Sequence, residues 1–435
     1  MPPAAQAAAA INHFLCVQAV AKSMRNPLAD GNWLTRERVC MVAAVSLAVT
    51  LIVLGYLAFT ATGTLDRFGR PLGTDFSNVW SAGQMALEGR AAEAWDWAAH
   101  HRVQQEIHGS ARVPFFGWHY PPPFLLVASL LALLPYLASL AVWQVSTLGA
   151  AATVLRGIVP RRTALLAGLG APVVFICLGH GHNGFLTAAL LAGGLLLLDR
   201  RPLVAGLLLG CLVYKPQFAL LIPPLLLVMG RWRAIAGAAL SSGALIGLTL
   251  LIWGWPVWQA FLDSLPLTRT IVIESGATGW HKIQSPFGMI RMWGGAIGPA
   301  YAVQTAATVA SIGLVLWLAR CGKAAERNAA ATAAALLSTP YVLDYDFVVL
   351  GMGIAFLATD GLRRGFLSWE KSLLALVWLT PLVARTAAEM TLVPLGQASA
   401  IAILALAVRR AVVLDGARLP LRSSPFRHSH GASGQ

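Results

Sequence analysis

The chain has 435 residues, of which 57% are hydrophobic and only 11% charged, and its mean hydropathy is +0.67. Water-soluble domains are usually about a quarter charged, so this composition excludes an ordinary soluble enzyme and favours a protein that crosses a membrane several times. The 32 lysine and arginine residues outnumber the 18 aspartate and glutamate residues, which gives a net charge of +14. Because basic residues collect at the cytoplasmic ends of membrane spans, the excess indicates topology rather than a nucleic-acid partner.

The first long apolar run covers residues 39–62, and a helix needs about 20 residues to cross roughly 30 Å of hydrocarbon. Residues 1–38 have no sustained apolar core, so we expect no cleavable signal peptide. Their basic residues are Lys22, Arg25, Arg36 and Arg38. We therefore predict a cytoplasmic segment at 1–38, a membrane domain at 39–410 and a cytoplasmic tail at 411–435.

A polar stretch at 63–119 follows and carries six of the acidic residues, which predicts a long first loop on the outer side. Within it, Asp75 begins a helix-like run that ends near Gly89. The carboxylate of Asp75 has two interpretations. It could cap the helix by accepting backbone N–H bonds, or it could act as a general base that takes a proton from an acceptor hydroxyl.

Eleven further apolar runs make the expected number of spans about twelve; they cover approximately 121–155, 163–179, 184–198, 202–214, 217–230, 234–253, 293–319, 329–343, 347–362, 371–388 and 394–408. Short basic clusters alternate with uncharged connections between them, and a consistent topology results when these clusters lie in the cytoplasm. The run at 121–155 is too long for one straight span and contains Pro135, so we expect a short and a longer segment with one net crossing. Residues 255–292 are expected to form a second long outer loop.

This topology places four polar motifs on the outer side with the loop at 63–119, as a single active site would require. They lie at residues 180–183, 214–217, 280–282 and 344–346. In the first, His180 and His182 are two residues apart and do not share a helical face, and no third ligand lies nearby, so a metal site is not expected. His180, His182 and Asn183 are instead candidates for hydrogen bonds to a sugar.

Lys215 is an isolated cation at the outer end of an apolar run. It could be an interfacial lysine, or it could meet an anionic partner such as a lipid phosphate, to which Gln217 could also bond. In the second outer loop, Trp280 and His281 are candidates to stack on sugars, and Lys282 and Arg291 are candidates to meet phosphate, although anchoring at the membrane interface competes with both roles.

Asp344 and Asp346 flank Tyr345 at the start of an apolar run. Carboxylates close to a membrane are costly and often functional, which makes both residues candidates to bind hydroxyls of the sugar or acceptor. Alternatively, they could be two solvated helix caps. Both interpretations remain open from the sequence.

Over residues 70–365 these motifs resemble, in order and spacing, glycosyltransferase family 87, whose members use polyprenyl-phosphate sugars and include mycobacterial α-1,2-mannosyltransferases. The resemblance is carried by Asp75-Phe76 with Trp80, Tyr120-Pro121-Pro122, the stretch around Asn183, Lys215-Pro216-Gln217, and Ser338-Thr339-Pro340 followed by Tyr345-Asp346. It implies a GT-C fold with amphipathic helices in the first outer loop, an inverting transfer without a metal, and Asp75 in the place of the catalytic aspartate. This chain departs from relatives at His182 and at Tyr345 and Asp346, so the resemblance leaves the sugar open.

The leading hypothesis is therefore a membrane glycosyltransferase of a bacterial inner membrane that acts on its periplasmic face. It would move a hexosyl residue, such as mannose, from a polyprenyl-phosphate donor to a lipid or glycan acceptor, with no metal or other cofactor. The alternative is a transporter or flippase of a lipid-linked saccharide. Transporters commonly show paired repeats and ionisable residues in mid-membrane, and the sequence shows neither.

Overall fold

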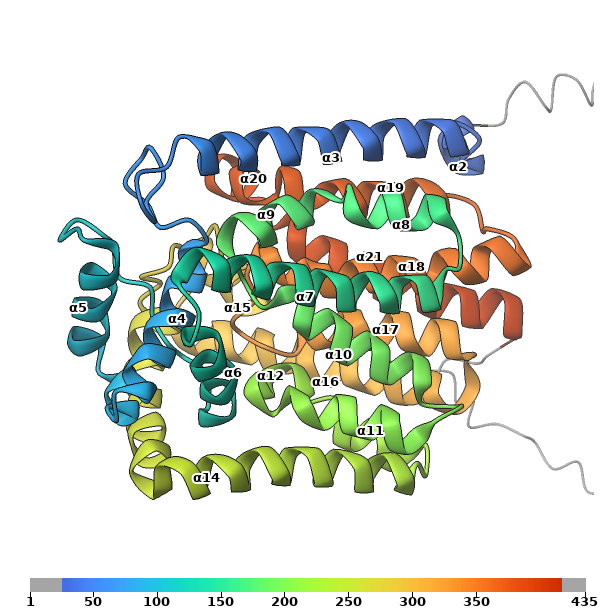
Figure 1. Cartoon of the computed structure of the whole chain (residues 1–435). Helices are drawn as coiled ribbons and strands as arrows, with labels where there is room; N and C mark the ends of the chain where they lie inside the picture. Colours follow the sequence, from blue (N-terminus) through green and yellow to red (C-terminus); the bar gives the residue numbers. More distant parts are fainter. Residues whose placement is uncertain (1–25, 417–435) are drawn as a thin grey trace, which may run out of the picture.

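The computed structural model describes residues 26–416. These residues are almost entirely helical, and their only β-structure is a pair of isolated bridges that involve Thr62, Leu65 and Pro71. The long helices lie side by side, while shorter helices gather at one end of the bundle (Figure 1). The expected all-α class is confirmed.

Six helical stretches among the described residues are long and apolar enough to cross a membrane. They are α3 (Arg36–Phe59), α7 (Tyr136–Ile158), α14 (Trp232–Thr268) with the π-helical turn η3 (Arg269–Glu274), α16 (Ile297–Cys321), the turn η4 (Asp344–Asp346) with α18 (Phe347–Arg364), and α21 (Leu395–Asp415). The protein is therefore a polytopic membrane protein.

Two bent helix pairs raise the possible number of spans to eight. The first is α8 (Arg162–Leu169) with α9 (Pro172–His180), bent by 52°, and the second is α19 (Glu370–Leu379) with η5 (Thr380–Leu382) and α20 (Ala384–Thr391), bent by 75°. The expected number of about twelve crossings stays a prediction.

Shorter apolar helices complete the bundle: α6 (Pro122–Ala132), α10 (Gly184–Leu197), α11 (Pro202–Gly210) with η2 (Cys211–Tyr214), α12 (Pro216–Ala219) and α13 (Ile222–Val228). The break expected within 121–155 is present between α6 and α7. Close packing depends on glycine in places: a Cβ on Gly206 of α11 would lie 2.0 Å from the carbonyl oxygen of Ala234 in α14, so a larger residue would push these helices apart.

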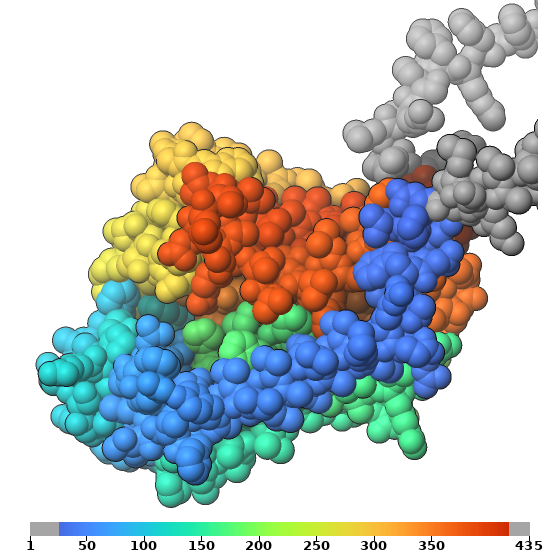
Figure 2. Space-filling view, turned by 90° about the horizontal axis from the view of Figure 1, so that it is seen from above, coloured from blue at the N-terminus to red at the C-terminus, as the bar shows by residue number. Residues whose placement is uncertain are grey.

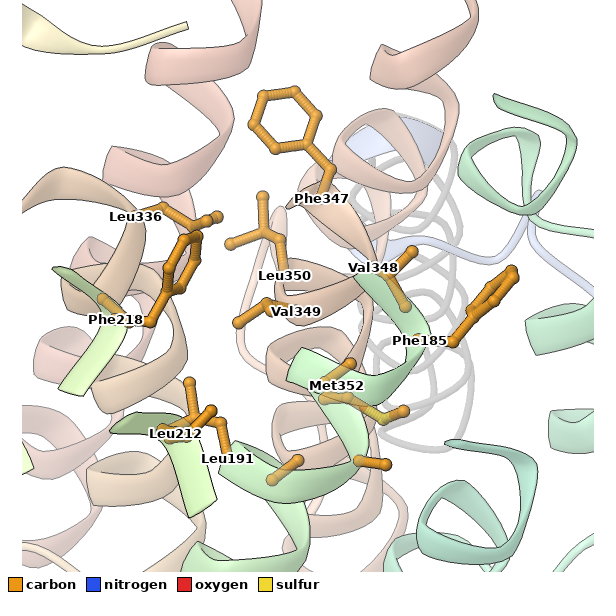
Figure 3. Close-up of a cluster of buried hydrophobic side chains, with 14 of the residues drawn as sticks. Phe185, Leu191, Leu212, Phe218, Leu336, Phe347, Val348, Val349, Leu350 and Met352 are labelled. Atoms are coloured by element: carbon orange, nitrogen blue, oxygen red, sulfur yellow. The ribbon is translucent and has the colours of Figure 1, made fainter. Parts of the chain in front are cut away.

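The hydrophobic core runs through most of the bundle, and one part of it lies between α18, α10 and α12. Phe347 to Met352 of α18 pack there against Phe185 and Leu191 of α10 and Phe218 of α12 (Figure 3). Helix α17 (Ala324–Leu337) is buried from Glu326 to Leu337. By contrast, α3 exposes large apolar side chains such as Ile52 and Phe59, as a surface that faces lipid requires.

The first outer loop is largely helical, as expected, and contains α4 (Thr74–Leu87), η1 (Ala91–Trp95) and α5 (Trp97–His108). Residues 255–292, predicted as a second long outer loop, are also partly helical. Helix α14 kinks at Gly254, whose φ of 71° breaks the helix, but it resumes at Pro256 and continues to Thr268. After η3, α15 (Pro286–Met292) closes this segment.

The predicted terminal segments fall partly outside the described residues. Lys22 and Arg25, and the tail from residue 417 onward, belong to this part of the chain. Arg36 and Arg38 lie at the start of α3.

Candidate active site

Asp75 lies in the first turn of α4, and its carboxylate has no hydrogen-bond or ion-pair partner among residues 26–416. The helix is not capped by a side chain. Its N-cap is Gly73, which adopts a left-handed φ of 70° and makes no side-chain bond. The interpretation of Asp75 as a helix cap is therefore wrong, because the chain turns into α4 through glycine and leaves the carboxylate free.

The surroundings of Asp75 raise the pKa of its carboxyl above the ordinary value. The largest cause is desolvation; Asp344 and Asp346 add to it, whereas His180 and Arg385 oppose it. These four groups come from three separate segments of the chain, so their electrostatic influence on one carboxylate indicates that the fold brings these segments together. A carboxylate with a raised pKa binds a proton more readily than an exposed one.

The segment between α9 and α10 forms one wall of this cluster. The Thr74 hydroxyl, next to Asp75, lies 2.7 Å from Nδ1 of His180. The ring of His182 stacks on Tyr345 with centroids 3.4 Å apart, and its Nε2 lies 3.4 Å from the Tyr120 hydroxyl. The predicted convergence of the outer motifs is thus present for residues 180–183 and 344–346.

Lys215 is buried and paired, which corrects its description as an isolated cation. Its ammonium donates to Asp346 over 2.6 Å and to Oδ1 of Asn183 over 3.2 Å, and it lies 4.8 Å from the ring centre of Phe218. Only 6% of the Lys215 side chain is exposed, so it is not an interfacial lysine that extends to water. The partner lies 131 residues away in the chain, which is why sequence spacing did not reveal it.

Asp344 is paired with Arg385 over 2.8 Å. Both Asp344 and Asp346 are buried, so their interpretation as solvated caps is wrong, although Asp346 does accept the backbone N–H of Leu343. Arg385 was not among the residues singled out from the sequence. It could have been recognised as a charged residue inside the apolar run 371–388, because burying a charge there costs free energy and such residues are usually functional.

Several buried polar atoms of this cluster lack a partner among the described residues. They include Nδ1 of His182, Nδ2 of Asn183 and Nε of Arg385. Buried donors and acceptors are nearly always hydrogen-bonded, so three unpaired atoms in one cluster indicate a place that receives a polar ligand.

The remaining candidates lie on the second outer loop, apart from Gln217 on α12. The Arg291 guanidinium lies 5.1 Å from the ring centre of Trp280 and donates to the carbonyls of Gly295 and Glu274. The site roles predicted for Gln217, Trp280, His281, Lys282 and Arg291 stay predictions.

The loop does reach the edge of the cluster through its backbone. The N–H of Gln284 donates to the carbonyl of Val342 over 2.8 Å, only two residues before Asp344. Among residues 26–416, no group of three or more His, Cys, Asp or Glu side chains is arranged to hold a metal ion.

Comparison with known proteins gives one match. A family model described as glycosyltransferase family 87 matches residues 118–343, just over half of the chain. The matched region contains residues 180–183, Lys215 and the second outer loop, whereas Asp75 lies before it and Asp344, Asp346 and Arg385 lie after it. No curated protein and no solved structure matches the chain.

Proposed function

Because the chain belongs to glycosyltransferase family 87, we propose that it transfers a hexosyl residue from a polyprenyl-phosphate donor to a hydroxyl group of a lipid or glycan acceptor. The observation that carries this proposal is the free, partly buried carboxylate of Asp75 at the centre of a polar cluster. A carboxylate without an internal partner is available to a substrate.

In the proposed reaction, Asp75 accepts the proton of the acceptor hydroxyl while the hydroxyl oxygen bonds to the anomeric carbon of the sugar. The bond between that carbon and the donor phosphate breaks, and its electron pair leaves with the phosphate. The raised pKa of Asp75 supports this role, because the carboxyl must hold the proton until the products depart. Phosphate is a good leaving group, so the step needs no metal.

The departing phosphate is proposed to bind to Lys215 and Arg385. Each cation is held by one carboxylate and keeps further N–H donors: a lysine ammonium has three, of which two are used, and Nε of Arg385 is unpaired. Lys282 and Gln217, whose side chains have no hydrogen-bond partner among the described residues, are further candidates. Arg291 is a candidate as well: its guanidinium donates to two backbone carbonyls, but its Nε, like that of Arg385, is buried and unpaired.

The sugar hydroxyls are proposed to bond to His180, His182 and Asn183. Nδ1 of His182 and Nδ2 of Asn183 are buried and unpaired, as expected of groups whose partner is a ligand. Trp280 and His281 would contribute if the second outer loop closes over the sugar.

Replacement of Asp75 by asparagine tests the proposed base. Asp75→Asn keeps the shape of the side chain and, because Asp75 caps no helix, should leave folding and membrane insertion unchanged. We expect sugar transfer from a polyprenyl-phosphate-hexose donor to slow by roughly 10²–10⁴-fold while donor binding is retained.

Asp66→Asn is a control, since Asp66 lies in the same loop and bonds only to the backbone of Phe68 and Arg70. Transfer at the parental rate by Asp75→Asn would remove Asp75 from the mechanism. Movement of the labelled lipid across liposomes without a new glycosidic bond would point to a carrier instead.

We place this reaction on the periplasmic face of a bacterial inner membrane, because the basic clusters lie at the other end of the helices. Single cysteines introduced near Glu93 and near Ser275 should then react with an impermeant reagent from outside, and a cysteine near Arg231 should not. Labelling of the two loops from the cytoplasmic side would reverse this orientation.

A further inference from the structure

A long apolar groove of about 1100 Å³ lies between α3, α7, α8, α18 and α19. Figure 2 views the molecule from the side on which α3 lies. On α18 the lining runs from Val348 to Leu362, roughly 21 Å of helix and about two thirds of the ~30 Å of membrane hydrocarbon. The groove therefore extends from beneath the candidate active site toward the opposite end of the molecule.

All charged residues that line this groove are basic. They are Arg36, Arg38, Arg161, Arg162 and Lys371, and the lining contains no aspartate or glutamate. None of the five forms an ion pair among residues 26–416. The groove thus combines an apolar interior with a positively charged end, at the start of α3 and α8 and away from α4 (Figure 1).

The position of these cations within their own helices is unfavourable. Arg36 and Arg162 are the first residues of α3 and α8, where the helix dipole favours negative charge. Glu37 is exposed beside Arg36, and Glu370, beside Lys371, is already bonded to Arg410. The helix dipoles and the neighbouring acidic residues therefore do not neutralise the positive charge at this end of the groove, whereas a bound anion would.

We propose that the groove binds an anionic phospholipid, with its phosphate between Arg36, Arg161 and Arg162 and its acyl chains along the apolar lining. This lipid is distinct from the sugar donor, whose phosphate has to reach Lys215 at the other end of α18. Residues 1–25 are a poor occupant, because they contain Lys22 and Arg25 and no acidic residue, so their charge has the same sign as the rim. Helices α8 and α9, which line the groove, lead to His180, so the lipid would support a segment that carries the site.

Native mass spectrometry of the full-length protein with phosphatidylglycerol and phosphatidylcholine in competition tests the site. We expect a preference for phosphatidylglycerol that falls by roughly 30-fold in Arg161→Gln/Arg162→Gln, since each basic residue near a lipid surface contributes about a fivefold factor. Arg200→Gln/Arg201→Gln is the matched control. This exposed pair also precedes a helix and forms no ion pair, but it lies outside the groove, and the preference should persist.

A second variant tests the apolar part without changing charge. A Cβ on Gly351 meets no atom within 4 Å, so Gly351→Phe should fold and fill the groove, and we expect it to lose the bound lipid as well. Retention of phosphatidylglycerol by either groove variant, or equal loss in the control pair, would overturn the proposal. Displacement of phosphatidylglycerol by polyprenyl phosphate would assign the groove to the donor, and increased binding after removal of residues 1–25 would assign it to that segment.

Discussion

The protein buries charged side chains at both ends of the same helix bundle, and the two clusters differ in how completely they are paired. At the end away from α4, Arg410 is fully buried and bonded to Asp360 and Glu370, and Arg364 is bonded to Asp360, Glu326 and Asp415. Within this cluster, every charged side chain has a partner of opposite charge. The cluster joins α17, α18, α19 and α21, so its pairing serves the fold.

The cluster at the other end contains the pairs Lys215–Asp346 and Asp344–Arg385 but leaves Asp75 unpartnered. An unpaired buried charge costs free energy, and folding alone gives no reason to keep it. The difference shows that burial of charge is not by itself a sign of function. A carboxylate with no partner at all is the stronger indication, because single unpaired oxygens also occur in the other cluster, on Glu326 and Asp415.

The largest effect on stability is expected from Arg410. Arg410→Met would leave Asp360 and Glu370 buried with a lost partner, which should lower the free energy of unfolding by about 3–5 kcal/mol. Thermal unfolding in detergent measures this loss, and transfer activity per folded molecule should stay near the parental value.

Arg409→Met is the control, because Arg409 donates only to the carbonyl of Ser368 and pairs with no carboxylate. If Arg410→Met were stable but inactive, the contrast between the two ends would be wrong.

Variants of Lys215 can distinguish a structural ion pair with Asp346 from a role of Lys215 in binding the donor phosphate. Lys215→Met alone leaves Asp346 unpaired, so it should destabilise the protein whatever its role. The double variant Lys215→Met/Asp346→Asn removes both charges and should recover stability. If Lys215 binds the donor phosphate, the double variant should still need roughly 10- to 150-fold more donor, the equivalent of about 1.5–3 kcal/mol for a charge-assisted hydrogen bond. A donor KM that recovers together with stability would make the pair purely structural.

The smallest expected effect is on the pH dependence of sugar transfer, which two substitutions near Asp75 should shift in opposite directions. Asp75 acts as a base only when ionised, so transfer should be lost as the pH falls through its pKa, and the raised pKa places this loss at a higher pH than for an exposed aspartate. Arg385→Gln removes a positive charge that lowers the pKa of Asp75, so the acid limb should move to higher pH. Asp344→Asn removes a negative charge that raises this pKa, so the limb should move to lower pH.

Both substitutions break the same ion pair, and each therefore serves as the structural control for the other. Shifts in the same direction would show that a group other than Asp75 titrates in the rate profile.

The sequence predicted those features that depend on residues close together in the chain. Apolar runs of the required length predicted the long helices, and the broken run at 121–155 was recognisable from Pro135. The helix that begins near Asp75 was also predicted, but its cap was not, because the positive φ of Gly73 depends on how the loop enters α4. The continuation of α14 past Gly254 was missed for a similar reason, since Pro256 can either end a helix or begin one.

The amino-acid sequence by itself determined that the chain lies in a membrane, which segments are helical, and which polar motifs could meet on one side, because hydropathy and charge act along the chain. Only the tertiary structure decided the partners. Asp346 meets Lys215 across 131 residues, Arg385 meets Asp344, and Asp75 is left without a partner, because these contacts depend on how helices distant in sequence pack together. The free carboxylate, on which the proposed chemistry rests, is a property of that packing.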